Sequence, residues 1–132
     1  MNPPRDRTTS KRALTLWASF GYAVRGIYAV AWSQRNFRIH VMAATLVCVV
    51  AWWLECSRLE WAILLITMGF VLVSEALNTA VETVVDLVSP EYHVLAARAK
   101  DVAAGAVLIA ALTAVGVAVV ILLPLMYERI QP

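Results

Sequence analysis

The longest uncharged segment of the chain constrains its fold most strongly. From residue 102 to residue 127 there is no Asp, Glu, Lys or Arg, a run of 26 residues. About 20 apolar residues are enough for a helix to cross a bilayer. The run therefore predicts a membrane-spanning helix, which we expect over residues 99–127.

Two earlier segments have the same character. Residues 39–54 are uncharged and end in Trp52 and Trp53, which is typical of a span that meets the membrane interface. Residues 61–74 are uncharged but too short to span alone, so we expect their helix to continue past Glu75 until Ser89-Pro90 ends it. These patterns predict two more membrane helices, over residues 37–55 and 59–88.

The N-terminal part differs from the three spans. It has seven Lys and Arg among its first 38 residues and no clean apolar core, so it does not resemble a cleaved signal peptide. We expect residues 1–10 to form a flexible tail and residues 11–34 to form an amphipathic helix lying in the membrane interface. The alternative is an ordinary amphipathic helix packed on the bundle. The imperfect apolar face of this segment consists of Leu14, Trp17, Phe20, Tyr28 and Trp32.

Composition excludes several other classes of protein. The chain is 61% hydrophobic and 15% charged, with a net charge of +2, whereas soluble domains are about 45–50% apolar and about 25% charged. An ordinary soluble globule, a disordered chain and a nucleic-acid-binding protein are all disfavoured. Cys48 and Cys56, about 12 Å apart on one helix, are too distant for a disulfide, so we expect free thiols.

The distribution of Lys and Arg predicts the orientation of the chain in the membrane. Nine of these residues lie before the first span or between the second and third, and two lie on the other side. Because cytosolic loops carry the excess of positive charge, we expect the N-terminus and the loop over residues 89–100 to face the cytosol.

Four polar residues of the second span carry the strongest chemical signal. Glu75, Asn78, Glu82 and Asp86 are spaced by 3, 4 and 4 residues, which places them within an arc of about 80° on one helical face. Carboxylates in a membrane helix are costly, so they should face protein or water. Hydrogen bonds to neighbouring helices are one explanation, and a functional site is the other.

The depth of these residues favours an enzyme. Glu75 lies 16 residues after Leu59, about 24 Å along the helix and near the cytosolic edge of a hydrocarbon core about 30 Å thick. A transporter would need its charges at the midplane. Carboxylates at the leaflet that faces MgATP suggest phosphoryl transfer, since carboxylates and substrate phosphates together hold Mg²⁺. The sequence has no Walker or kinase glycine-rich loop, so any nucleotide site must be built differently.

At these residues the chain resembles the small integral-membrane lipid kinases of bacteria, the diacylglycerol kinases and their undecaprenol kinase relatives. The resemblance covers about residues 19–121. Its motifs are Glu75-x-Leu-Asn78-Thr-Ala-Val-Glu82-x-x-Val-Asp86, Ser89-Pro-Glu91-Tyr92-His93 and Arg98-Ala-Lys100-Asp101. The segments Asn36-Phe-Arg38-Ile-His40 and Ser57-Arg-Leu-Glu-Trp61 are closer to the undecaprenol kinase branch.

The resemblance implies an all-α integral membrane fold of three spans plus the surface helix, assembled as a homotrimer with shared active sites in the bacterial inner membrane. It implies transfer of the γ-phosphate of ATP, with Mg²⁺, to the hydroxyl of a membrane lipid. Glu75 would be the catalytic base, Asn78 would support it, and Glu82 would bind Mg²⁺. The nucleotide contacts would be Tyr22, Gln34, Glu82, Glu91, Tyr92, His93, Lys100 and Asp101, and the supporting residues would be Arg38, Asp86 and Arg98.

One position departs from the family pattern. The family usually has a second metal-binding Glu three residues before the Phe of the Asn-Phe-Arg motif, and here that residue is Gln34. Its amide oxygen can still bind Mg²⁺ but carries no charge. A non-catalytic membrane subunit or nucleotide-binding relative therefore stays as the second hypothesis. For the acceptor, undecaprenol is favoured and diacylglycerol is the close second. We expect His40 to be an interfacial residue rather than a ligand.

Overall fold

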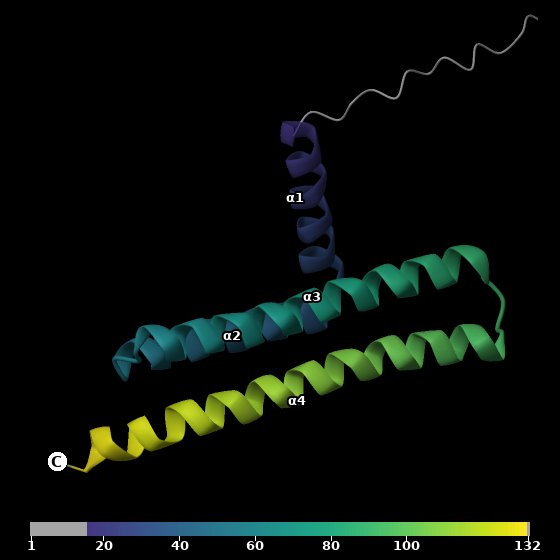
Figure 1. Ribbon diagram of the computed structural model, residues 1–132. Coiled ribbons are helices and arrows are strands. Elements are labelled where there is room, and N and C mark those ends of the chain that lie inside the picture. Colours follow the sequence, from purple (N-terminus) through teal and green to yellow (C-terminus); the bar gives the residue numbers. More distant parts are fainter. Residues whose placement is uncertain (1–15, 132) are drawn as a thin grey trace, which may run out of the picture.

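The structure is a computed structural model that describes residues 16–131, and every regular element in this range is a helix (Figure 1). The expected tail over residues 1–10 and the first part of the expected surface helix, residues 11–15, lie outside the described residues. The helices are α1 (Leu16–Ser33), α2 (Arg35–Trp53), α3 (Arg58–Val88) and α4 (Val94–Ile130).

Helices α2, α3 and α4 are each long and apolar enough to cross a membrane. Helices α3 and α4 run antiparallel and pack along most of their length, whereas α2 packs on α3 and scarcely meets α4. With a rise of 1.5 Å per residue, α3 is about 46 Å long and α4 about 55 Å, so both exceed a hydrocarbon core of about 30 Å. The excess length carries their ends into the interface and the water beyond.

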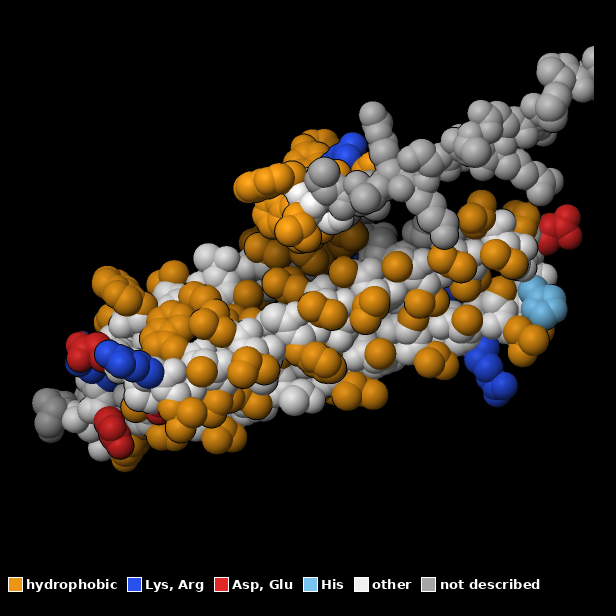
Figure 2. All heavy atoms as spheres, turned by 45° about the horizontal axis from the view of Figure 1, so that its top comes forward, with side chains coloured by type: hydrophobic (Ala, Val, Ile, Leu, Met, Phe, Trp, Pro, Cys, Tyr) orange, Lys and Arg blue, Asp and Glu red, His pale blue; other side chains and the backbone are white. Residues whose placement is uncertain are grey.

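The surface of the bundle is apolar. Figure 2 shows hydrophobic side chains along the length of α3 and α4, with the charged side chains of this face gathered near the two ends. Few side chains of the described residues are buried; the apolar ones are Phe37, Ala51, Leu54, Leu64, Val71, Val107 and Ala110. So large an apolar surface is stable in lipid and not in water. The chain is therefore an all-helical membrane protein, as its sequence predicts.

Helix α1 lies crosswise to the other three (Figure 1). None of its residues is buried, and large side chains such as Trp17, Phe20 and Tyr28 are exposed. An amphipathic helix packed on the bundle would bury its apolar face, and within this single chain α1 does not, which favours the surface helix. The exposed aromatic residues fit a helix that lies in the membrane interface.

Arg38 joins α1 to α2. Gln34 is the single residue between the two helices and has an extended backbone (φ −101°, ψ 115°). One turn further on, the Arg38 guanidinium donates hydrogen bonds through Nη1 to the carbonyl oxygens of Ala31 (3.3 Å) and Trp32 (2.7 Å). Carbonyl groups in the last turn of a helix lack hydrogen-bond partners within the helix, and a cation at that end interacts favourably with the helix dipole. Arg38 therefore stabilises the angle between α1 and α2 at Gln34.

Replacing Arg38 with Leu should loosen the last turn of α1. Loss of the charged hydrogen bonds removes about 1–2 kcal/mol of local stability, so amide exchange over residues 30–34 should accelerate about 5–30-fold. Hydrogen–deuterium exchange of the protein in nanodiscs measures this. Arg35→Gln, which removes a neighbouring positive charge, is the control and should leave that exchange unchanged. Equal exchange in Arg38→Leu and the native chain would contradict the role of Arg38.

The turn between α2 and α3 is closed by local bonds. Glu55 has a positive φ (58°), which ends α2, and its carboxylate accepts a hydrogen bond from Arg129 of α4 (3.2 Å). Ser57 begins α3 with a capping box: its N–H donates to the Glu60 carboxylate, and its hydroxyl oxygen accepts from the Glu60 N–H. In the same turn Cys56 is a free thiol, and burial together with the charge of Glu60 raises its pKa.

The turn between α3 and α4 is short. Helix α3 ends at Val88, before Ser89-Pro90, and α4 begins at Val94, where we expected its span only from residue 99. His93 caps α4, because its Nδ1 accepts a hydrogen bond from the Leu95 N–H (3.2 Å). Arg98 and Lys100 therefore lie on the first turns of a helix and not in a loop.

Candidate functional site

One face of α3 is buried from Leu64 to Asn78 and changes from apolar to polar along the helix. Leu64 and Val71 occupy this face in the first half of α3, and Glu75 and Asn78 continue it in the second half. Only 2% of Glu75 and 8% of Asn78 are exposed. The row of acids expected on one helical face therefore begins at Glu75, directly after the apolar residues of the same buried face.

Asn78 is held in a defined orientation. Its Nδ2 donates a hydrogen bond to Oε1 of Glu82, one turn further along α3 (3.1 Å). Its Oδ1 is buried and has no hydrogen-bond partner in the described part of the chain. A buried acceptor without a partner is costly and usually marks a place where a ligand or water binds. The amide of Asn78 therefore offers a free acceptor beside the two glutamates.

Glu75 lies within electrostatic reach of two side chains, the His40 imidazole of α2 and the Glu82 carboxylate. The Thr79 hydroxyl donates to the backbone carbonyl of Glu75 (3.0 Å) and not to its carboxylate. The electrostatic influence of His40 on Glu75 was missed in the sequence, where His40 was interpreted as an interfacial residue. The sequence signal that could have indicated this is that His40 lies one helical turn after Asn36 of the Asn36-Phe-Arg38 segment.

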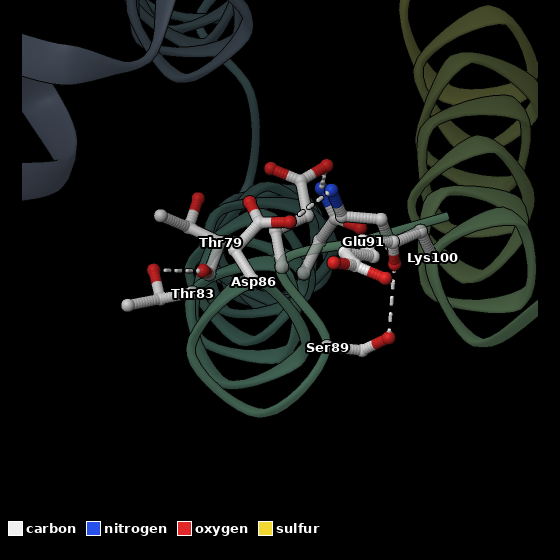
Figure 3. Close-up of polar contacts among 8 residues, drawn as sticks. Thr79, Thr83, Asp86, Ser89, Glu91 and Lys100 are labelled. Carbon is white, nitrogen blue, oxygen red and sulfur yellow. Dashed lines mark hydrogen bonds and ion pairs between the residues drawn. The ribbon is translucent and has the colours of Figure 1, made fainter. Parts of the chain in front are cut away.

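Asp86, near the C-terminal end of α3, and Lys100, near the N-terminal end of α4, link the two helices (Figure 3). The ammonium Nζ of Lys100 lies 2.7 Å from Oδ1 of Asp86. The side chains are 38% and 66% exposed, so the ion pair is screened by water and contributes little to stability. Lys100 can therefore leave Asp86 for a stronger anion at low cost.

A hollow of about 200 Å³ lies at the α3–α4 turn, beside this ion pair. Glu91, Tyr92 and His93 line it together with Asp86 and Lys100. The Ser89 hydroxyl donates to the carbonyl oxygen of Glu91 (3.1 Å) and fixes the turn (Figure 3). Because Nδ1 of His93 is used in the helix cap, Nε2 is the nitrogen that stays available to a ligand. The hollow thus combines a cation, an imidazole, a phenol and two carboxylates.

Other predicted site residues lie outside this hollow. Tyr22 is on α1, where the Arg25 guanidinium lies over its ring at 4.7 Å. Gln34 stands at the α1–α2 break, and Glu82 lies one turn before Asp86. Asp101 is exposed at the beginning of α4, next to Lys100. The structure therefore brings together two groups of predicted residues. One group lies at the α3–α4 turn and consists of Asp86, Glu91, Tyr92, His93 and Lys100. The other lies on one face of α3 and consists of Glu75, Asn78 and Glu82.

The side chains of this site can hold Mg²⁺ only together with ligands that come from a bound substrate. Within residues 16–131, no cluster of three or more His, Cys, Asp or Glu side chains is arranged to hold a metal ion. Glu82 offers a carboxylate oxygen that the Asn78 amide does not occupy. Mg²⁺ is commonly held by one or two carboxylates together with substrate phosphates. The residues therefore suit an ion that arrives with a phosphorylated ligand.

Three apolar helices with a row of acids at one end define an integral membrane protein with a site close to the membrane interface. Residues 21–122 match the family model described as prokaryotic diacylglycerol kinase. The chain belongs to this family, whose members are lipid kinases.

Curated relatives carry two names. An undecaprenol kinase of Bacillus subtilis (strain 168) is 42% identical over 106 residues, which cover 80% of this chain and 86% of that protein. A diacylglycerol kinase of Synechocystis sp. is 47% identical over 123 residues, which cover 92% of this chain and 70% of that protein. A diacylglycerol kinase of Escherichia coli (strain K12) is 39% identical over 95 residues, covering 72% and 78% respectively.

Proposed function

We propose that this lipid kinase transfers the γ-phosphate of MgATP to the hydroxyl of a membrane lipid, with undecaprenol favoured and diacylglycerol second. The observation that carries the proposal is the row of Glu75, Asn78 and Glu82, of which the first two are buried, on the helix that leads to the hollow at the α3–α4 turn. A lipid hydroxyl and a soluble nucleotide can meet only at such a boundary between hydrocarbon and water.

Glu75 acts as the general base in this proposal. Its carboxylate takes the proton of the lipid hydroxyl as the hydroxyl oxygen forms a bond to the γ-phosphorus. The bond from the γ-phosphorus to the β–γ bridging oxygen breaks, and ADP leaves with that electron pair. Asn78 supports the acceptor, because its free Oδ1 is beside Glu75 on the same helical face.

Nucleotide binding is assigned to the residues around the α3–α4 turn. Lys100 exchanges Asp86 for the phosphates, and Glu91, Tyr92 and His93 line the hollow beside it. Tyr22 and Asp101 complete the nucleotide contacts as the α1 helix and a neighbouring chain close over the site. Asp86 and Arg98 support this region, and Arg38 supports it by holding α1.

Glu82 and Gln34 are the residues assigned to Mg²⁺, together with the nucleotide phosphates. When bound, the ion neutralises negative charge on the phosphates as it develops during transfer. The carboxylate of Glu82 contributes charge to this site, and the Gln34 amide contributes only an oxygen.

The site faces the cytosol in this proposal, in the inner membrane of a bacterium. The excess of Lys and Arg before α2 and around the α3–α4 turn supports this orientation. A homotrimer with shared sites is part of the proposal, since Tyr22 of α1 does not line the hollow at the α3–α4 turn of its own chain.

Transfer of labelled γ-phosphate from ATP and Mg²⁺ to lipid, by the purified protein in nanodiscs, tests the function. Undecaprenol and diacylglycerol are offered separately at matched concentrations, and we expect more product from undecaprenol. Nucleotide binding without product from either lipid would favour the second hypothesis, a non-catalytic membrane subunit, which Gln34 motivates.

Gln34→Glu should strengthen the binding of Mg²⁺. Adding a carboxylate to the ion's surroundings is expected to lower the Mg²⁺ concentration at half-maximal activity by about 3–10-fold. The measurement is a Mg²⁺ titration of phosphoryl transfer at fixed ATP. Asn36→Asp adds the same charge nearby at an exposed position and controls for a general field effect. An unchanged titration in Gln34→Glu would remove Gln34 from the metal site.

A further inference from the structure

An apolar groove of about 230 Å³ lies between α2 and α4, with α3 as its floor. It exists because α2 and α4 both pack on α3 but scarcely meet one another. Leu64, Met68 and Val71 form the floor. All three helices can span a membrane, so the medium that surrounds the groove is hydrocarbon. Water has little reason to enter such a space, whereas a lipid chain can.

Alanines form the walls of the groove. Ala43 and Ala44 line it from α2, and Ala111, Ala114 and Ala118 line it from α4. A larger apolar side chain at any of these positions would narrow the groove. The small side chains therefore keep a channel open at the depth of the lipid tails.

The inner end of the groove leads to the acid row. Val71 of the floor and Glu75 lie four residues apart on the same buried face, about 6 Å along α3. His40 lines the groove and also lies within electrostatic reach of Glu75. Beyond Glu75 is the buried Oδ1 of Asn78, an acceptor that has no partner within the described residues. A ligand that fits has an apolar chain and, at its cytosolic end, a hydrogen-bond donor.

We propose that this groove binds the hydrocarbon chain of the acceptor lipid, and that it selects an alcohol with a single chain. The inference rests on the proposed function and extends it to the acceptor's tail. This groove extends toward Glu75 as a single channel between α2 and α4. A lipid with two chains must leave one outside, so a single-chain, polyprenyl-type alcohol gains more contact than a diacylated glycerol.

Narrowing the groove tests chain binding, and the comparison of undecaprenol with diacylglycerol described above tests the selection. Ala114→Leu adds bulk to the wall, and Thr113→Leu adds bulk to an exposed position at the same depth. Phosphoryl transfer is measured with undecaprenol and with dimethylallyl alcohol, which is too short to fill the groove. Ala114→Leu should lower kcat/KM for undecaprenol about tenfold or more and change that for the short alcohol less than twofold. Thr113→Leu should change neither value.

Two results of this assay would overturn the proposal. An equal loss for both alcohols in Ala114→Leu would show damage to the protein rather than to chain binding. No loss for either alcohol would show that the chain binds elsewhere. Failure of the native protein to phosphorylate any alcohol would instead refute the proposed function, and the groove then needs a readout that does not depend on turnover.

Photolabelling supplies that readout. A single-chain alcohol with a diazirine at mid-chain is bound to the protein in nanodiscs, irradiated, and its adducts are mapped by mass spectrometry. We expect adducts at Ala111, Ala114 and Ala118, reduced at least about tenfold by Ala114→Leu but not by Thr113→Leu. Adducts spread evenly over the lipid-facing side chains of α4 would overturn the proposal. So would their absence from the groove, which is expected if a second copy of the chain covers it.

Discussion

Glu75→Gln is expected to reduce phosphoryl transfer by about 10²–10⁴-fold, because the amide cannot take the proton of the acceptor hydroxyl. The fold should survive, since Gln has nearly the same shape and avoids the cost of a buried charge. The variant should therefore unfold at the same temperature as the native chain, or at a higher one. Turnover with saturating ATP and acceptor, together with thermal unfolding in detergent, measures both effects.

Glu55→Gln is the matched control for this change. It makes the same carboxylate-to-amide substitution at the other end of the bundle, where Glu55 pairs with Arg129 at an exposed position. Its activity should stay within about twofold of the native value, since exposed ion pairs contribute about 0–1 kcal/mol. Turnover near the native rate in Glu75→Gln would exclude Glu75 as the base.

Glu82→Gln is expected to lower kcat/KM for MgATP by about 10²–10³-fold. Its amide oxygen can still accept the hydrogen bond from Asn78 Nδ2, so the geometry of α3 is retained while the negative charge is lost. Activity should then depend on higher Mg²⁺ concentrations. A Mg²⁺ titration at fixed ATP, compared with that of Glu75→Gln, separates a metal role from a base role.

The two glutamates should differ in this comparison. Glu82→Gln is expected to shift the half-saturating Mg²⁺ concentration upward, whereas the residual activity of Glu75→Gln should show the native Mg²⁺ dependence. An unchanged Mg²⁺ dependence in Glu82→Gln would assign Glu82 to the support of Asn78 alone. The measurement thus distinguishes a metal ligand from a residue that only orients its neighbour.

Local patterns in the sequence predicted the fold class. Uncharged runs and the Ser89-Pro90 stop predicted three long apolar helices, because a span in lipid must be continuous and predominantly apolar. The spacing of Glu75, Asn78 and Glu82 predicted a common face, since helical geometry alone determines it. The ends of the helices were less predictable: α4 begins at Val94 because His93 caps it, and neither hydropathy nor charge marks that residue.

Contacts between helices were not predictable from one sequence. The approach of His40 to Glu75 and the ion pair of Asp86 with Lys100 depend on how α2, α3 and α4 pack. The groove depends on the divergence of α2 from α4, whereas a run of alanines in sequence indicates only close helix packing. Likewise, the position of Arg38 over the end of α1 follows from the extended backbone of Gln34, which has no clear sequence signal.

The unequal packing of the helices has a consequence for the order in which parts of the protein unfold. Helices α3 and α4 form an extensively packed hairpin that carries Glu75, Asn78, Glu82 and Lys100, whereas α2 is held by fewer contacts. Segments with fewer buried contacts open at lower free energy. On warming, α1 and α2 should detach first and take one wall of the groove with them. The acids would remain in register on an intact hairpin. A heated sample would therefore no longer bind the acceptor while its helix content stayed nearly native.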